Sequence, residues 1–254
     1  MKPVAIDFPA ISTSTLFSGT AVNLPAGSQL LLNGTQTTNI FTGATQYEYK
    51  FAPGVLVAPL LVNPSGINYS TVTFTVTGET PFGAPVEQVL LGPAAGASLK
   101  LTEYFYKITS ITANAVIQPG FTIGLSGTGT ILIQTDYWNK EALYTLQIAN
   151  TVQNASGPDI DLSYTCYPPY EFDYGTYTPT DKEIFKDSFV AVPVDGNNVT
   201  TSPDPLTFPI SANAAVSLTG IPVRGFAANV TSGTTYTVNT GSFTLMFMQQ
   251  GAQF

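Results

Sequence analysis

The feature that most constrains the fold is a recurring alternation of threonine with large apolar residues. In STVTFTVTGETPFGAPVEQVLL, from Ser70 to Leu91, threonine alternates with valine and phenylalanine before a Gly/Pro-rich break and a second apolar run. Successive side chains of a strand point to opposite faces, so this pattern predicts one buried face and one face covered by hydroxyl groups. Helical periodicity is nearly absent, and only short stretches such as Ala94–Lys100 and Thr180–Lys186 fit a helical turn. We therefore expect an all-β protein.

Similar runs recur along the whole chain and are separated by Gly, Pro, Asn and Ser. The candidate strands are Gln29–Asn33, Tyr47–Phe51, Val55–Val62, Thr71–Thr77, Val86–Leu91, Tyr104–Ile117, Phe121–Leu125, Thr130–Thr135, Ala142–Ala149, Ile160–Cys166, Ser188–Val194, Leu206–Ile210, Ala214–Leu218, Val223–Val230, Tyr236–Asn239 and Ser242–Met248. The glycines of GTGT, from Gly127 to Thr130, indicate a turn. Short strands at this spacing predict two β-sandwich or jelly-roll-like modules of antiparallel strands, with very little helix.

A module boundary is expected within TDYWNKEALYT, which begins at Thr135 and follows a strand-turn-strand series. This places an N-terminal β module at residues 1–136 and a C-terminal β module at residues 137–254; a single larger sandwich is the alternative. Trp138, the only tryptophan, is either a core anchor or a plug between modules. The short charged N-terminal segment either straps onto a neighbouring molecule or forms a first strand.

Residues 159–187 of the second module differ from the rest of the chain because they are acidic and rich in tyrosine. Pro168 and Pro169 are incompatible with a central strand, so we interpret the segment as a long projecting loop. Its candidate contact residues are Tyr167, Tyr170, Phe172, Tyr174 and Tyr177. Three interpretations are open for these residues: they form a protein interface, they bind a glycan, or they pack on their own module.

The C-terminal run Ser242–Met248 is apolar on both faces and carries two further candidate interface residues, Phe243 and Phe247. A strand of this kind must be covered on both faces, either by the core or by another subunit.

The composition argues against most enzyme chemistry. The chain contains no histidine and one cysteine, Cys166, so it cannot form Ser-His or Cys-His catalytic pairs or a histidine zinc site. No phosphate-binding or dinucleotide-binding glycine motif is present. The carboxylate pairs Asp159/Asp161 and Glu171/Asp173 leave a glycosidase, a calcium site or a solvated acidic loop as interpretations. We expect no enzyme activity, no cofactor and no metal.

The low charge and the absence of long apolar runs argue against nucleic acid and membranes as partners. Only 9% of residues are charged and the net charge is −8, so we expect no nucleic-acid binding. No apolar run is long enough for a membrane helix. A surface so poor in charge suits a protein covered by neighbours or one exposed outside the cell or on a virion; the alternative is that neutral hydroxyl side chains simply keep the β-strands soluble.

Several motifs resemble a segment that recurs in structural proteins of tailed bacteriophages. They are FTVTG (Phe74–Gly78), PVEQV (Pro85–Val89), GPAAG (Gly92–Gly96) and YFYKITSIT (Tyr104–Thr112), and the C-terminal IPVRGFAANVTSGTTYTVNTGSFTLMFMQQG is similar to the ending of many such proteins. The resemblance covers about 90 residues in motifs that mostly reflect strands and turns. It implies a β-rich virion component with no catalytic residues to carry over.

The function we expect is a non-enzymatic structural component of a bacteriophage virion. It would assemble as a symmetric oligomer on the capsid, as a decoration or cement protein. A tail or head-tail junction protein is the first alternative, and a module that binds carbohydrate on the host surface is the second. The expected partners are other copies of the chain and virion proteins such as major capsid or tail proteins, with a host glycan under the second alternative.

Overall fold

The computed structural model describes residues 4–9, 11–20, 22–38, 45–63, 66–81, 83–134, 143–150, 159–165, 190–191, 206–209, 214–218, 225–230 and 243–250. These residues form strands, turns and bends without a helix, which confirms the all-β prediction. The described residues include no helix able to cross a bilayer. Backbone contacts divide the chain into two compact units, residues 11–128 and residues 1–10 with 129–254. The predicted boundary at residues 136 and 137 lies outside the described residues.

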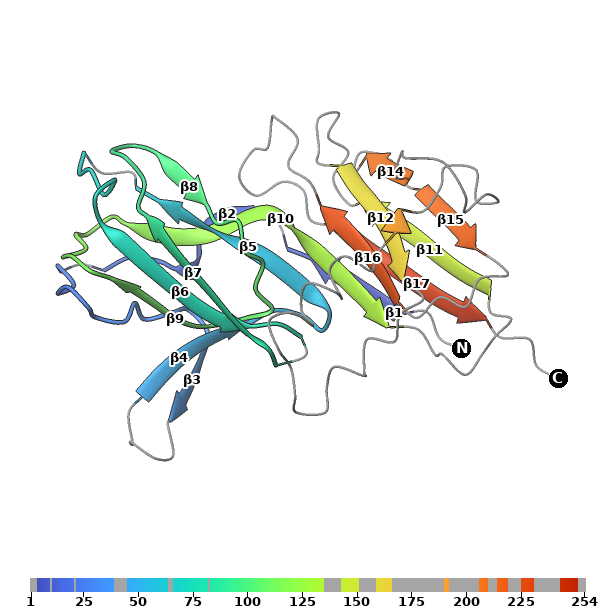
Figure 1. Cartoon of the computed structure of the whole chain (residues 1–254), viewed down its shortest axis with the longest axis horizontal. Coiled ribbons are helices and arrows are strands. Elements are labelled where there is room, and N and C mark those ends of the chain that lie inside the picture. The colour runs from blue at the N-terminus through green and yellow to red at the C-terminus, as the bar shows by residue number, and fades with distance from the viewer. Residues whose placement is uncertain are drawn as a thin grey trace. The chain divides into compact units, whose positions relative to one another are not determined.

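The unit of residues 11–128 consists of two sheets (Figure 1). One has the strand order β2-β10-β5-β8 and the other the order β3-β4-β9-β6-β7. The strands are β2 (Ser12–Phe17), β3 (Thr35–Thr38), β4 (Thr45–Lys50), β5 (Val55–Val62), β6 (Thr73–Glu79), β7 (Pro85–Leu91), β8 (Ser98–Lys100), β9 (Lys107–Ala113) and the first part of β10 (Thr122–Gln134).

The second unit also consists of two sheets. One is the four-stranded sheet β1-β17-β11-β15, and the other has the order β10-β16-β12-β13, in which β14 also pairs with β12. The strands are β1 (Val4–Phe8), β11 (Leu143–Asn150), β12 (Asp159–Thr165), β13 (Val190–Ala191), β14 (Leu206–Pro209), β15 (Ala214–Leu218), β16 (Gly225–Val230), β17 (Phe243–Gln250) and the last part of β10.

Both units have the strand order of a jelly roll. When the strands of a unit are lettered B to I along the chain, one sheet has the order B-I-D-G and the other C-H-E-F. In the first unit β2 is strand B, β10 is strand I, and β3 is an additional strand beside C. In the second unit β1 is B, β17 is I, and β13 and β14 together occupy position F along β12.

The chain therefore inserts one jelly roll into the B–C connection of the other. Residues 11–128 lie in the sequence between β1 and the part of β10 that pairs with β16. Strand β10 is the last strand of the inserted unit and continues as strand C of the second unit. Residues 4–8 pair within their own chain, because β1 pairs with β17 from Val4 opposite Phe247 to Phe8 opposite Phe243.

The alternation in the sequence produces the core. In β6, Phe74 and Val76 are fully buried while the flanking threonines are partly exposed. Phe74 stacks on Phe121, with ring centroids 5.2 Å apart, and Tyr69 meets Phe121 edge-on at 5.3 Å. Burial of one such side chain contributes roughly 1.5–3 kcal/mol, so this alternation accounts for much of the stability of the unit.

Three predictions of local structure are wrong. Gln29–Asn33 is not a strand, because within it only Gln29 forms an isolated bridge, to Thr112. GTGT does not end a strand, because β10 continues from Thr122 to Gln134. Gly127 has a φ of 70°, so the glycine introduces a local kink inside a continuous strand. The stretch Ala94–Lys100 contains a turn followed by β8 instead of a helical turn.

Candidate interaction surface

The outward side of the β6–β9 pair in the first unit is covered by hydroxyl groups. Thr73, Thr75 and Thr77 alternate with buried residues of β6, and Thr112 of β9 stands opposite Thr75. The hydroxyls follow directly from the Thr-Val/Phe alternation. This surface can form hydrogen bonds, and its charged neighbours, Glu87 opposite Thr77 and the Glu79–Lys107 pair, lie at one end of it.

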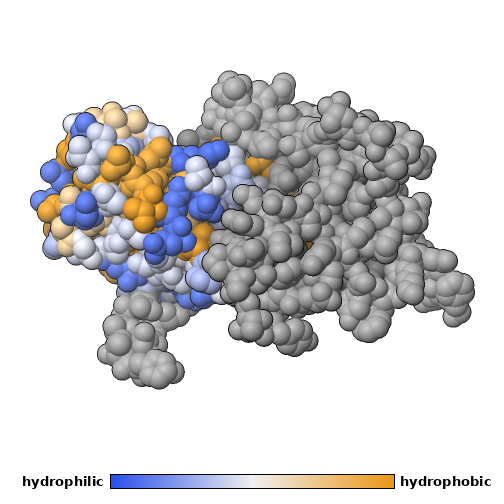
Figure 2. Space-filling view, in the orientation of Figure 1, coloured by the Kyte–Doolittle hydropathy of each residue, from blue (hydrophilic) through white to orange (hydrophobic). Residues whose placement is uncertain are grey.

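Two exposed apolar side chains flank this row on the edge strand β7. Val89 stands opposite Thr75 and Leu91 opposite Thr73, and each is 57% exposed. Figure 2 shows apolar residues on the visible surface of this unit, among hydrophilic ones. We call Thr73, Thr75, Thr77, Thr112, Val89 and Leu91 the threonine face.

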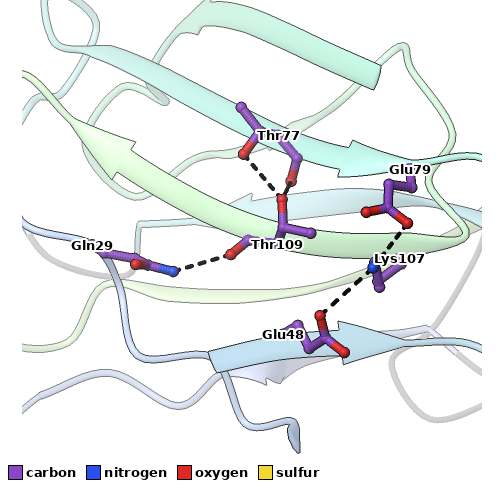
Figure 3. Close-up of polar contacts among 6 residues, drawn as sticks. All are labelled: Gln29, Glu48, Thr77, Glu79, Lys107 and Thr109. Carbon is purple, nitrogen blue, oxygen red and sulfur yellow. Dashed lines mark hydrogen bonds and ion pairs between the residues drawn. The ribbon is translucent and has the colours of Figure 1, made fainter. Parts of the chain in front are cut away.

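A β-bulge fixes one end of the threonine face. The register between β6 and β9 shifts after Thr77, which leaves Thr109 as the extra residue. The Thr109 hydroxyl donates to the Thr77 carbonyl oxygen at 3.2 Å, and its own carbonyl accepts from Gln29 Nε2 at 3.0 Å (Figure 3). A Cβ on Gly78 would lie 2.1 Å from the Lys107 carbonyl oxygen, so only glycine fits beside the bulge.

Charged side chains gather next to the bulge. Lys107 Nζ lies 2.8 Å from Glu79 and 3.7 Å from Glu48 (Figure 3). Burial alone would lower the pKa of Lys107, but the hydrogen bond to Glu79 and the charges of Glu48 and Glu79 outweigh it and raise the pKa above its ordinary value. Lys50, opposite Lys107 in the register, lies over the Tyr106 ring at 5.3 Å. This end of the sheet is therefore charged and internally paired.

The Gln88 side chain of β7 binds the segment that follows β8. Gln88 Oε1 accepts from the backbone N–H groups of Thr102 and Glu103 at 3.1 and 3.0 Å, and Gln88 Nε2 donates to Thr102 Oγ1 at 2.8 Å. These bonds hold the segment before β9 against β7.

The structure places few of the site residues predicted from the sequence. Trp138, Tyr167, Tyr170, Phe172, Tyr174 and Tyr177 lie outside the described residues, as do Glu171 and Asp173. Phe243 lies in β17 opposite Phe8 and Asn150. Phe247 is 5% exposed and packs on Phe226, with ring centroids 5.8 Å apart, so its ring is covered by its own unit. Asp159 and Asp161 lie in β12, opposite Pro209 and Thr207.

Sequence reasoning missed Val89 and Leu91 as surface residues. The signal was present, because PVEQVLL alternates buried Val86 with exposed Glu87 and Val89. Within the described part of the chain, no three His, Cys, Asp or Glu side chains gather as a metal site would require.

Comparisons with known proteins add little to this picture. No protein-family model matches the chain, and no curated protein matches it significantly. A search of solved structures found a weak likeness, with a TM-score of 0.19 and 10% identity, to a chain described under "The Triple Jelly Roll Fold and Turret Assembly in an Archaeal Virus". The alignment covers 97% of this chain and 66% of that one, so this chain spans just under two thirds of its length. The jelly-roll assignment rests on the strand order described above, and the resemblance to tailed-phage proteins stays a prediction.

Proposed function

We propose that the chain is a non-enzymatic structural component of a virion that assembles as a symmetric oligomer on the capsid. The supporting observation is the threonine face: a hydroxyl row flanked by exposed Val89 and Leu91, with Glu87 as the one charged residue of β7 beside it, on a jelly-roll sheet. Jelly rolls build viral capsid proteins but also lectins and cupins. The proposal therefore depends on the surface, since a fold alone does not determine function.

The chemistry of the threonine face suits a protein partner. Hydroxyl groups exchange bonds to water for bonds to a partner at little net cost, whereas buried charges must be desolvated. Apolar side chains among them supply the contact area that drives association. Only 9% of the residues of the whole chain are charged, so the other surfaces of the protein also carry few charges that a partner would have to desolvate. Repeated contacts with neighbouring capsid subunits would add through multivalency.

The test compares two surface variants. The double substitution Val89→Asp with Leu91→Asp places two charges on the threonine face, and Val22→Asp places a charge at a residue that is 67% exposed and lies outside that face. Co-sedimentation with capsid shells measures binding. The proposal predicts that the double variant loses binding while Val22→Asp and the parent chain retain it. Equal binding by all three proteins would contradict a role for the threonine face.

A tail or head-tail junction component is the neighbouring alternative within the same class. It would form a closed ring in solution through head-to-tail contacts and would not bind shells. The same sedimentation experiment, run without shells, detects such a ring.

A further inference from the structure

Asn33 clamps the start of the β3–β4 hairpin to strand β2. Its Nδ2 group donates to the carbonyl oxygens of Ser14 and Thr15 at 3.1 and 3.3 Å, and its Oδ1 accepts from Ser18 Oγ at 3.4 Å. Its backbone N–H also donates to the Leu16 carbonyl oxygen at 2.8 Å. The amide thus satisfies carbonyl groups on β2, an outer strand of its sheet.

The next residue must be glycine. A Cβ on Gly34 would lie 1.9 Å from the Glu48 carbonyl oxygen and 2.9 Å from Tyr49 Cα, so β4 passes too close for any side chain. Position 33 requires a side chain with a two-proton donor, because it faces two carbonyl oxygens. The fold therefore requires both members of Asn33-Gly34, the one Asn-Gly pair in the sequence.

We propose that Asn33 is a site of spontaneous deamidation, which the clamp slows and whose product releases the clamp. The deprotonated backbone nitrogen of Gly34 attacks Cγ of Asn33, a C–N bond forms, the Cγ–Nδ2 bond breaks and ammonia leaves. Water then opens the cyclic imide at either carbonyl and gives aspartate or isoaspartate. The net change consumes one water and releases one ammonia, with no oxidant or reductant.

The hydrogen bonds of the clamp compete with the first step. Attack on Cγ requires the side-chain amide to be free to turn toward the nitrogen of Gly34, and three bonds hold it, two to β2 and one to Ser18 just after that strand. Asn33 is nevertheless exposed to solvent, so water reaches it whenever the clamp opens. Deamidation in the native protein should therefore follow local opening of this segment.

The product cannot restore the clamp. A carboxylate has no proton to donate and would face the Ser14 and Thr15 carbonyl oxygens, which are also acceptors. Isoaspartate would in addition lengthen the backbone between β2 and β3. The reaction thus irreversibly detaches the start of the β3–β4 hairpin from β2. This inference does not depend on the function proposed for the threonine face.

The first measurement follows deamidation of the full chain by peptide mass mapping in mildly alkaline buffer, with and without a denaturing concentration of urea. We expect conversion at Asn33 to be at least about ten-fold slower in the folded protein than in urea. A ten-fold difference corresponds to a free energy of about 1.4 kcal/mol for the local opening that frees the amide. Equal rates in the two conditions would overturn the proposal.

The second measurement compares Asn33→Asp with Asn114→Asp, which adds the same charge at another exposed asparagine. Asn114 acts as an acceptor, with its Oδ1 bound to the Thr73 N–H at 2.9 Å, so aspartate retains that bond. We expect Asn33→Asp to lower the thermal midpoint and to speed proteolysis near the hairpin, whereas Asn114→Asp changes neither. Equal thermal midpoints and equal proteolysis rates for the two variants would overturn the proposal that an aspartate at position 33 releases the clamp.

Discussion

The two jelly rolls share one strand order, but one is formed by a continuous stretch of the sequence and the other by two separate stretches. The unit of residues 11–128 is continuous in the sequence, so all of its strands lie between its ends. The other unit takes strand B from the N-terminus and strand I from the C-terminus, and a hydrogen bond of 2.6 Å joins Asp7 and Thr244 across 237 residues. We therefore expect the continuous unit to fold without the rest of the chain, and the discontinuous unit to require both β1 and β17.

The largest effect is expected from deleting residues 1–10, which should destabilise one unit and not the other. Deleting residues 1–10 removes β1 and with it Phe8, which is 1% exposed, and it leaves one edge of β17 without its partner strand. Losing one buried phenylalanine side chain alone costs about 3–5 kcal/mol. We expect this deletion to unfold the discontinuous unit and to leave residues 11–128 folded, as judged by limited proteolysis and hydrogen exchange.

A matched pair of substitutions sharpens this test. Phe8→Ala should lower the stability of the discontinuous unit, and Phe17→Ala, at a residue 2% exposed in β2, should lower that of the continuous unit. If either substitution destabilised both units equally, the division into two units would be incorrect.

Gly78→Ala should have the next largest effect and should be confined to the continuous unit. The added Cβ would lie 2.1 Å from the Lys107 carbonyl oxygen and 2.7 Å from Phe105 Cδ1, so the bulge must move. We expect a loss of about 2–3 kcal/mol in urea unfolding. Gly66→Ala is the control, because a Cβ there meets nothing within 4 Å. Equal stability of the two variants would mean that the bulge tolerates a side chain.

Tyr69→Phe should have a smaller effect on the same unit. The Tyr69 hydroxyl accepts from the Gln118 N–H at 2.9 Å while its ring is 2% exposed. Removing the hydroxyl leaves that N–H without this partner and should cost about 1 kcal/mol. Thermal unfolding measures the loss, and an unchanged midpoint would show that water replaces the hydroxyl.

The smallest effect concerns Lys107 and pH. Because its pKa is raised in the folded state, the stability that it contributes is present below its ordinary value of 10.5 and is lost as the pH rises through the folded pKa. An ion pair of this exposure contributes about 1 kcal/mol or less. Lys107→Met should therefore flatten the alkaline end of the curve of stability against pH, and an unchanged curve would contradict the role of the Glu48 and Glu79 contacts.

Local patterns predicted strands well where one face is buried. The run Val55–Val62 coincides with β5, and Val86–Leu91 differs from β7 by one residue at its start. In both strands the alternation or run of apolar residues is set by the core beside it. The threonine row was likewise predicted as a hydroxyl-covered face.

Features that depend on distant partners could not be predicted in this way. Strand β1 is defined by pairing with β17 at the other end of the chain, and no local pattern records such a pairing. Position 124 accepts only glycine, because a Cβ there would lie 1.9 Å from the Ser12 carbonyl oxygen on β2, a strand far away in the sequence. That β7 is the last strand of its sheet likewise depends on the topology.

The most direct test of the proposed assembly is the mass of the purified full chain by light scattering, measured alone and after mixing with capsid shells. We expect a monomer or small symmetric oligomer that saturates the shells, with binding abolished by the Val89→Asp and Leu91→Asp double substitution. A monomer that stays monomeric and leaves the shells unoccupied would contradict a structural role in the virion.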